Sequence, residues 1–551
     1  MNKLKKSLII TALSLLAFIP IASTTNNYFE ISKNLDIFAT LYKEVNTYYV
    51  DDIDPAKFMR TGINAMLETL DPYTNYISEA DIEGYRFQTT GRYGGIGAII
   101  RKAGDQIVIA EPYLNYPADK SGLRAGDILL EVEGKSTKGK EVDDVSKILK
   151  GAPGTEVKLV IQRAGEKGTT AKTLTREEVK VSSVPYHGML EGNIGYIRLT
   201  QFTEGCGQEV ADALKDLESK IELKGVVFDL RSNPGGLLNE AVNVSNVFID
   251  KGKEIVSTKG KVKEWDKQYN ALNNAVDSQI PLVILTNSGS ASASEIVTGV
   301  AQDYDRAVIV GQRTYGKGLV QTTRQLSYGT QLKVTTAHYY TPSGRSIQSL
   351  DYSHRNEDGS VGRIPDSLKH AFKTTGGRVV FDGGGIDPDF KMDAEKLSPI
   401  TVSLLQKNLI FDYATDYRMK HEVIEPAKDF HLPDAEYNDF IKWLSTKEYD
   451  YSTKSEEAMK DLKEKAQKEE YWDAIQSDFN HLQNEMNHDK DKDLNKNKNE
   501  IRQMLEEEIA VRYFYQNGRI EASLKQDPEV KKAIEILNSP DIYNKALQAS
   551  N

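Results

Sequence analysis

The chain contains 551 residues, of which 39% are hydrophobic and 27% are charged, and its formal net charge is −11 at pH 7. A single hydrophobic core rarely supports this length, so we expect several domains, and the composition is that of a folded chain rather than a disordered one. The acidic balance, without a local basic patch, argues against nucleic acid as the main partner, because phosphate binding requires concentrated positive charge.

The first residues have the features of an export signal. Lysines precede an apolar run over residues 8–19, and the small residues Ala22 and Ser23 follow it. We expect residues 1–23 to be a signal peptide and the protein to be exported, to the periplasm if the source has two membranes. The alternative is an uncleaved signal that anchors the chain, although the apolar run is short for a membrane span.

Residues 24–85 are the predicted N-terminal helical region. Apolar residues recur there at helical spacing, as at Leu35, Phe38 and Tyr42. The pattern ends at Leu70-Asp71-Pro72, because proline disfavours the helical conformation in the residue before it.

Glycine and β-branched residues dominate the next region, residues 86–177. Strands are expected at 96–101, 106–110, 128–132 and 157–163. These runs predict a compact β-rich module.

Residues 178–400 alternate between strand-like and helical runs. Strands are expected at 194–199, 225–230 and 282–285, and helices at 208–217 and 237–248. The alternation predicts an α/β core. The only cysteine of the sequence, Cys206, excludes an intramolecular disulfide, and we interpret it as structural because no partner histidine lies near it.

Residues 401–551 are helical in pattern and highly charged. We interpret the stretch 488–493, in which lysine and aspartate alternate, as a solvated loop. Helical spacing resumes at Ile501, Leu505, Ile509 and Tyr513. The tail is therefore predicted to be a folded helical domain, for which an adaptor role or self-association is the candidate function.

A strand, a turn of small residues and a helix are predicted over residues 281–297. This arrangement exposes a serine at a helix start, where unpaired N–H groups and the helix dipole stabilise the negative charge of acyl transfer. By local chemistry, Ser290, Ser292 and Ser294 are equivalent candidates for the nucleophile. A capping turn is the alternative interpretation, since serine is a preferred N-cap residue.

Downstream, residues 308–321 form a predicted strand that runs into Lys317, which has a glycine on each side. The two segments together resemble the core signature of the C-terminal processing, or tail-specific, peptidases, which are serine proteases with a Ser-Lys dyad. In that family the base lysine lies 25 positions after the nucleophile, and 317 minus 292 is 25. The resemblance therefore implies Ser292 as nucleophile and Lys317 as base, with Gln321 orienting the lysine.

A lysine can act as a general base only when it is neutral, and a dry environment favours the neutral form. Tyr315, Leu319 and Val320 are the expected sources of that environment.

The predicted strand over residues 225–230 leads into Asn233-Pro234-Gly235-Gly236. Turn chemistry alone explains this run. The resemblance implies that the turn supplies a backbone N–H to the oxyanion hole, so we expect Gly235 or Gly236 to act together with the amide of Ala293.

None of the eight histidines lies in a motif that would support a Ser-His-Asp triad. His338 lies in a strand-like run that the family also carries, and we interpret it as structural. Asp303 follows the predicted nucleophile helix and either supports the site or ends that helix.

Two segments of the β-rich module, 91–100 and 117–129, resemble a PDZ domain. In that fold a glycine-containing loop binds a peptide's terminal carboxylate, and the adjoining strand pairs with the peptide. Gly94, Gly95, Ile96 and Gly97 match the peptide-binding positions.

The resemblance covers residues from about 35 to 400, and it departs from the usual family pattern at Tyr73 and Thr74, where many members have histidine and serine. It implies a multidomain α/β protein in which a protease core carries an inserted PDZ domain and flanking helical regions. The predicted domains are 1–23, 24–85, 86–177, 178–400 and 401–551.

The predicted function is that of an exported serine endopeptidase, which binds protein C-termini through its PDZ domain and forms an acyl-enzyme at Ser292. Protein or peptide substrates with exposed C-termini are the expected partners, and no metal or small-molecule cofactor is expected. The alternative is a catalytically inactive scaffold that only binds peptides.

Overall fold

The computed structural model describes residues 28–451, 453–486 and 490–549. The predicted signal peptide lies outside these residues. Within them, no helix combines the length and the apolar character needed to cross a membrane. The chain divides into two compact units, residues 1–76 with 323–334 and residues 77–322 with 335–551, which are described separately.

Between residues 28 and 68 the first unit is mainly helical, as predicted. A helix covers residues 28–48, and α2 spans Pro55–Glu68. The side chain of Asp54 caps α2, and the rings of Tyr42 and Phe58 stack with centroids 5.9 Å apart. The helix ends shortly before Pro72, where Asp71 accepts hydrogen bonds from the N–H groups of the following turn.

In the second unit, the PDZ-like module is an antiparallel sheet closed by helices. The strand order is β3-β4-β5-β7-β8, with β6 paired to β5. The bounds are β3 Ala98–Ala103, β4 Gln106–Pro112, β5 Ile128–Val132, β6 Lys135–Ser136, β7 Glu156–Gln162 and β8 Thr170–Thr175, with helices α4 Pro117–Lys120 and α5 Val142–Leu149. Its core consists of apolar side chains that alternate along β4 and β7, together with Leu129 and Val132 of β5. The four predicted strands are confirmed.

The segments that enter and leave the PDZ-like module pair with each other. Strand β2 (Arg92–Gly95), which leads into it, pairs with β9 (Glu177–Lys180), which leads out. The helical elements η1 (Glu79–Asp81) and α3 (Ile82–Thr90) precede β2.

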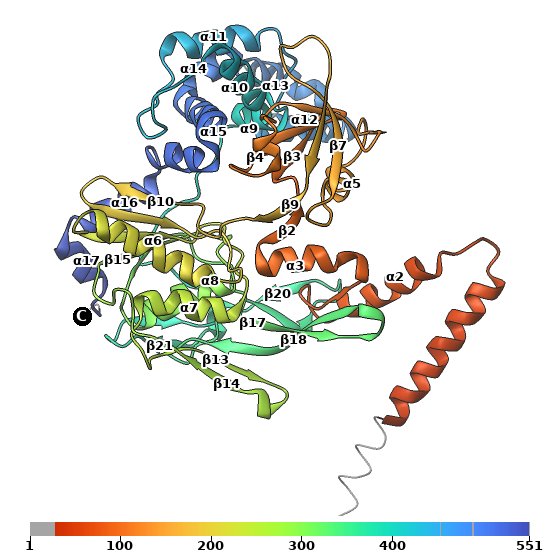
Figure 1. The fold of residues 1–551 in the computed structure, drawn as a ribbon, viewed down its shortest axis with the longest axis vertical. Coiled ribbons are helices and arrows are strands. Elements are labelled where there is room, and N and C mark those ends of the chain that lie inside the picture. Colours follow the sequence, from red (N-terminus) through yellow and green to blue (C-terminus); the bar gives the residue numbers. More distant parts are fainter. Residues whose placement is uncertain (1–27, 452, 487–489, 550–551) are drawn as a thin grey trace, which may run out of the picture. The chain divides into compact units, whose positions relative to one another are not determined.

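The α/β core contains a six-stranded sheet in the order β10-β11-β12-β15-β16-β23. Figure 1 labels two of its strands, β10 and β15. The strands are β10 Tyr186–Leu190, β11 Ile194–Arg198, β12 Gly225–Asp229, β15 Leu282–Thr286, β16 Val308–Gly311 and β23 Phe390–Lys391. Strands β11 to β23 are parallel, and β10 is antiparallel to β11. Their runs of apolar residues are buried on both faces, as parallel sheets require.

Different parts of the sequence cover the two faces of this sheet. Helices α6 (Cys206–Lys220), α7 (Leu238–Phe248) and α8 (Ala293–Asp303) cover one face. The other face packs against α16 (Pro528–Leu537) and α17 (Pro540–Ala546) from the end of the chain. The last two helices, which belong to the predicted domain 401–551, therefore pack on the sheet of the predicted protease core, and the predicted domain boundaries stay a prediction.

Further short strands flank the sheet: β13 Glu254–Gly260, β14 Lys267–Asn270, β17 Leu319–Gln325, β18 Gln331–Tyr340, β19 Leu350–Arg355, β20 Val361–Arg363, β21 Ala371–Lys373 and β22 Val379–Phe381. Strand β13 pairs with β14 and with the end of β18.

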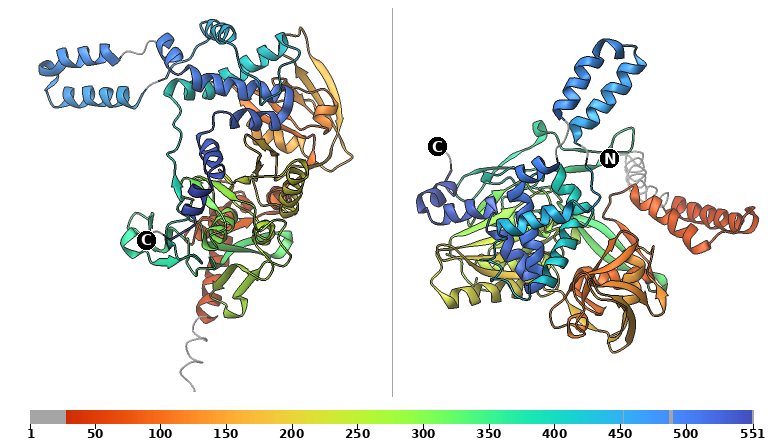
Figure 2. Two further views of the ribbon diagram at one scale, coloured as in Figure 1. Left: turned by 90° about the vertical axis from the view of Figure 1, so that its left-hand side faces the viewer. Right: turned by 90° about the horizontal axis from the view of Figure 1, so that it is seen from above.

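Most of the C-terminal region is helical, as predicted. Its helices are α9 Pro399–Gln406, α10 Leu409–Lys420, α11 Asp434–Leu444, α12 Lys454–Lys468, α13 Trp472–Met486, α14 Lys490–Lys496 and α15 Lys498–Leu524. Helices α12 and α13 lie side by side as a hairpin (Figure 2). The predicted loop at 488–493 is wrong from residue 490 onward, because α14 forms there and buries Leu494 in the helical core.

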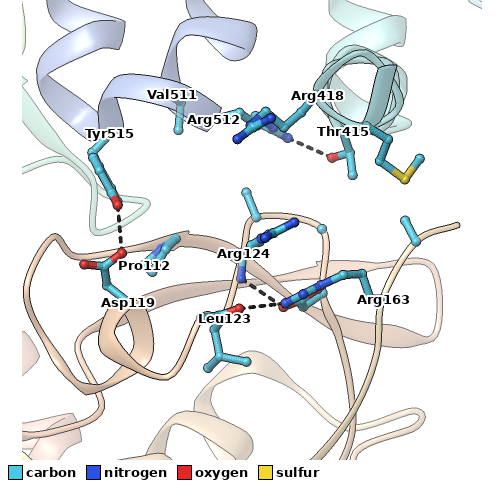
Figure 3. Close-up of a pocket in the computed structure, with 16 residues that line it drawn as sticks. Pro112, Asp119, Leu123, Arg124, Arg163, Thr415, Arg418, Val511, Arg512 and Tyr515 are labelled. Atoms are coloured by element: carbon cyan, nitrogen blue, oxygen red, sulfur yellow. Dashed lines mark hydrogen bonds and ion pairs between the residues drawn. The ribbon is translucent and has the colours of Figure 1, made fainter. Parts of the chain in front are cut away.

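The helical region and the PDZ-like module meet at a cavity of about 230 Å³ (Figure 3). Tyr515 of α15 donates its hydroxyl to Asp119 Oδ1 at 2.7 Å across this cavity. Its backbone has φ 57° and ψ −156°, a conformation that glycine favours, and it interrupts the helical geometry of α15.

Candidate active site

The predicted strand, turn and helix form at the expected place. Strand β15 ends at Thr286 and α8 begins at Ala293. Ser292 immediately precedes the helix with φ 55° and ψ −111°, a conformation that few non-glycine residues adopt. A strained turn between a strand and a helix is the geometry of a nucleophile elbow.

The structure separates the three candidate serines. Ser290 and Ser294 are fully buried, and each hydroxyl donates to a main-chain carbonyl, that of Leu230 at 2.8 Å and that of Asn233 at 2.9 Å. Ser292 is only half-buried. The geometry therefore favours Ser292 as the nucleophile, in agreement with the spacing argument.

The carboxylate of Glu295 connects the segments of Ser292 and Lys317. Its Oε2 accepts the backbone N–H of Ser292 at 2.8 Å and that of Lys317 at 2.9 Å. Its Oε1 accepts the Thr314 hydroxyl at 2.6 Å and the Gly316 N–H at 2.7 Å. One side chain thus holds the candidate nucleophile and the candidate base in a fixed relation.

Glu295 lies in the first turn of α8 and has no exposed surface. Burial raises the pKa of this carboxyl, and the hydrogen bonds from Thr314, Lys317, Gly316 and Ser292 oppose that rise. A buried acceptor with this many donors is a structural junction, because each donor would lack a partner if the carboxylate were removed.

The glycines beside Lys317 are required by close packing. A Cβ on Gly316 would lie 2.4 Å from Ser349 Oγ, and one on Gly318 would lie 2.9 Å from the Gln348 nitrogen. Lys317 itself is half-buried.

The three residues expected to dry this region differ in burial. Leu319 is 6% exposed and Val320 packs against the main hydrophobic core. Tyr315 is 40% exposed, so it contributes less to desolvation than predicted.

The Asn233-Pro234-Gly235-Gly236 turn lies directly beside the elbow. A Cβ on Gly235 would lie 2.8 Å from the Ala293 nitrogen and 2.9 Å from Ser292 Cβ. The Gly235 N–H donates to Asn233 Oδ1 at 2.9 Å, so it is already engaged. Among the described residues the N–H groups of Gly236 and Ala293 have no hydrogen-bond partner, which makes them the better pair of oxyanion donors.

Gln321 occupies β17, where its side-chain amide donates to Thr335 Oγ1 at 3.2 Å. Its predicted role in orienting Lys317 stays a prediction. Cys206 is fully buried, and burial raises its pKa, which agrees with its interpretation as structural. His338 lies on β18, where burial lowers its pKa.

Asp303 ends α8 and forms a buried ion pair with Arg345 at 2.8 Å. It also accepts the Ser343 N–H at 2.9 Å. These contacts fix the loop after β18, so Asp303 ends the helix and anchors a neighbouring loop.

The predicted peptide-binding glycines fall into two groups. Gly94 and Gly95 belong to β2, where they pair with β9 rather than forming a loop. Ile96 and Gly97 connect β2 to β3, and their carbonyls accept the N–H groups of Ala118 and Tyr113. Strand β3 is the edge of its sheet and lies beside α5, which is the arrangement that peptide addition requires.

Comparison with known proteins places this site in a family. The model described as "Peptidase family S41" matches residues 193–352, "PDZ domain" matches 108–163, and "Probable PDZ-protease, C-terminal helical domain" matches 400–537. A carboxy-terminal-processing protease of Bartonella bacilliformis is 40% identical over 330 residues, covering 59% of this chain and 75% of that protein. The chain belongs to peptidase family S41.

This S41 peptidase is therefore a serine-type enzyme with a PDZ domain and a C-terminal helical domain. A probable CtpA-like serine protease of Staphylococcus aureus strain COL is 40% identical over 317 residues, covering 57% of this chain and 62% of that protein. The chain thus spans less than two thirds of that relative.

Two solved structures are also similar. The photosystem II D1 C-terminal processing protease is 28% identical, with 66% of this chain and 93% of that chain covered and a TM-score of 0.34. The PDZ domain of a carboxy-terminal protease from Vibrio cholerae, in complex with peptide, is 29% identical, with 16% and 99% covered and a TM-score of 0.16.

Sequence reasoning missed two features of the S41 site. Glu295 lies three residues after Ser292, and its position in the first turn of a helix was the available signal. Asp229 and Arg231 also had no predicted role, although charges at the end of a fully apolar strand indicate a buried ion pair.

Proposed function

We propose that this peptidase is exported, binds the C-terminus of a protein substrate through its PDZ domain and cleaves it through an acyl-enzyme on Ser292. The observation that carries the proposal is the Glu295 carboxylate, which accepts the N–H groups of both Ser292 and Lys317. A nucleophile and a base that act together need such a fixed relation.

In the first half-reaction, neutral Lys317 Nζ takes the proton of the Ser292 hydroxyl while Oγ bonds to the scissile carbonyl carbon. The N–H groups of Gly236 and Ala293 stabilise the resulting oxyanion. The C–N bond then breaks as the lysine gives its proton to the leaving amine, which leaves an acyl-enzyme. In the second half-reaction water attacks the ester, the lysine takes the water proton, and that proton returns to Ser292 as the acid product leaves.

Cleavage of an unstructured protein tests the proposal. Ser292→Ala should abolish cleavage, whereas Ser78→Ala, at a half-buried residue before η1, should not. Undiminished cleavage by Ser292→Ala would contradict the assignment. If the parent protein bound peptides without cleaving them, the inactive scaffold would be the better description.

Export and the role of the tail need separate measurements. N-terminal sequencing of the protein recovered from cell fractions tests export and separates a cleaved signal from an anchor. Sedimentation of the full chain tests self-association through residues 401–551.

A further inference from the structure

An ion cluster joins the candidate oxyanion turn to the end of the chain. Arg231 lies two residues after β12, and its Nη2 contacts Asp229 Oδ2 at 2.6 Å. Its Nη1 contacts Asp527 Oδ2 at 2.7 Å and Glu529 Oε2 at 2.6 Å. Residues separated by almost three hundred positions thus share one guanidinium.

The cluster is largely removed from solvent. The side chains of Arg231, Asp527 and Glu529 are 14%, 13% and 10% exposed, and Asp229 has no exposed surface. Although burial opposes ionisation, the charge of Arg231 holds the pKa of Asp229 at about 2. Three carboxylates surround one guanidinium, so the loss of Asp527 or Glu529 removes a contact that holds Arg231 Nη1 rather than the compensation of its charge.

Asp229 is the fixed end of the cluster on the sheet. Its Oδ2 accepts the hydroxyl of Tyr196 at 2.6 Å, and its Oδ1 accepts the Arg231 N–H at 2.9 Å. Arg231 is therefore held by its main chain and its side chain at once, at the point where the chain leaves the sheet.

The next residues lead directly to the oxyanion candidates. Ser232 has φ 57°, and its N–H donates to Asn287 Oδ1 at 2.8 Å in the elbow after β15. The Asn233 carbonyl accepts the Ala291 N–H at 3.0 Å and the Ser294 hydroxyl at 2.9 Å. The direction in which this backbone leaves Arg231, together with the pairing of Gly236 with Phe202, therefore sets where the Gly236 N–H lies relative to Ser292.

The acidic partners come from the start of α16. Asp527 caps this helix, because its Oδ1 accepts the N–H groups of Glu529 and Val530 at 2.9 and 3.0 Å. Helix α16 packs its apolar side on the sheet that carries Asp229. The helix start is thereby held rigidly against Arg231.

We propose that Asp527 and Glu529 are positioning residues for the reaction: through Arg231 they set the oxyanion turn, so the C-terminal helical domain is part of the catalytic machinery. This inference rests on the proposed function of Ser292, Gly236 and Ala293. Neither acidic residue contacts the substrate. Their removal should lower kcat because the oxyanion donors move, while substrate binding is little affected.

The test uses the full-length protein, three variants that each remove one charge with little change of shape, and a double variant that combines the two at the cluster. Asp527→Asn retains a good N-cap residue, and Glu529→Gln retains one acceptor oxygen. Glu535→Gln is the matched control on the same helix, because Glu535 is 54% exposed and pairs only with Lys532 among the described residues. Measurements are kcat and KM on a peptide substrate, and thermal unfolding of each variant.

We expect Asp527→Asn and Glu529→Gln each to lower kcat at least tenfold with KM within twofold, and the double variant to lower it further, while Glu535→Gln matches the parent. Values of kcat within twofold of the parent in folded variants would overturn the inference. So would a loss of activity that only follows the fraction of unfolded protein, or a rise in KM at constant kcat.

Ser292→Ala is assayed in parallel, so that the two proposals can fail separately. If Ser292→Ala retains activity, the proposed function is wrong. If Ser292→Ala is inactive and the charge-removing variants keep the parent kcat, only the positioning role is wrong. If one variant does not fold, the other decides the outcome.

Discussion

Replacing Glu295 with glutamine tests the junction that holds the candidate dyad together. The carboxylate accepts four hydrogen bonds, two on each oxygen. A glutamine amide has one acceptor oxygen, and its NH₂ group cannot accept. In the best orientation its oxygen keeps the N–H groups of Ser292 and Lys317, and the Thr314 hydroxyl turns to accept from the NH₂ group.

The Gly316 N–H then has no acceptor. An unsatisfied buried donor costs about 1–3 kcal/mol, so Glu295→Gln should destabilise the protein by about that amount. If the resulting shift falls on the segment of Lys317, kcat should fall roughly 10- to 100-fold, because each tenfold loss corresponds to about 1.4 kcal/mol of activation free energy.

The assay combines chemical denaturation with steady-state cleavage of a peptide. Glu240→Gln is the control, because Glu240 is also buried and accepts a backbone N–H, that of Gly207 at 2.9 Å, but it belongs to α7. It should lower stability without lowering kcat. Equal effects of the two substitutions on kcat, or no effect of Glu295→Gln, would refute the junction role.

Other perturbations follow from single residues. Burial raises the pKa of Glu507 to about 7. Because this pKa is higher than that of the same carboxyl in the unfolded chain, the protonated carboxyl stabilises the fold at acidic pH. That contribution is lost as the pH rises from about 4.5 through about 7. Glu507→Gln should therefore be more stable than the parent at pH 8, by up to about 3 kcal/mol, and the difference should vanish near pH 4 in denaturation experiments, with the exposed Glu464→Gln as control. Gly235→Ala should lose activity and stability, because its Cβ would meet backbone atoms of Ala291 and Ala293 at 2.7 and 2.8 Å. The control is Gly134→Ala, which is also at positive φ but has no atom within 4 Å of the added Cβ. It should lower the free energy of unfolding by only about 1–2 kcal/mol, as measured by thermal unfolding. Tyr515→Phe removes the hydrogen bond to Asp119 and should lower the free energy of unfolding by about 1 kcal/mol. Amide hydrogen exchange should become faster where α15 contacts the PDZ domain. If exchange there is no faster than in the control Tyr471→Phe, at an exposed tyrosine, the hydrogen bond does not stabilise this contact.

Local patterns predicted the elements of the core well, because their physical causes lie within a few residues. The strands β11, β12 and β15 are short apolar runs between polar turns, and α6 and α7 carry an apolar stripe at helical spacing. Ser292 and Lys317 could be chosen only from the interval of 25 residues between their two segments, because local chemistry did not distinguish Ser292 from the neighbouring serines.

Features that depend on distant contacts were not predictable. The junction at Glu295 requires three loops to meet, and the pairing of Arg231 with Asp527 requires α16 to pack on the sheet. The residues around Tyr515 in the sequence do not indicate its strained backbone. The strain accompanies a contact with Asp119, which is distant in the sequence. The charge pattern predicted a loop at residues 490–493, but a helix covers residues 490–496, and burial of Leu494 favours that helix.

The central claim is that Ser292 is a nucleophile activated by Lys317. Its most direct test is reaction with an organophosphorus fluoride, followed by mass spectrometry of the digested protein. A single adduct on Ser292 is expected, and Lys317→Ala should slow its formation at least a hundredfold at neutral pH. An adduct on Ser290 or Ser294, or equal rates in the parent and Lys317→Ala, would contradict the claim.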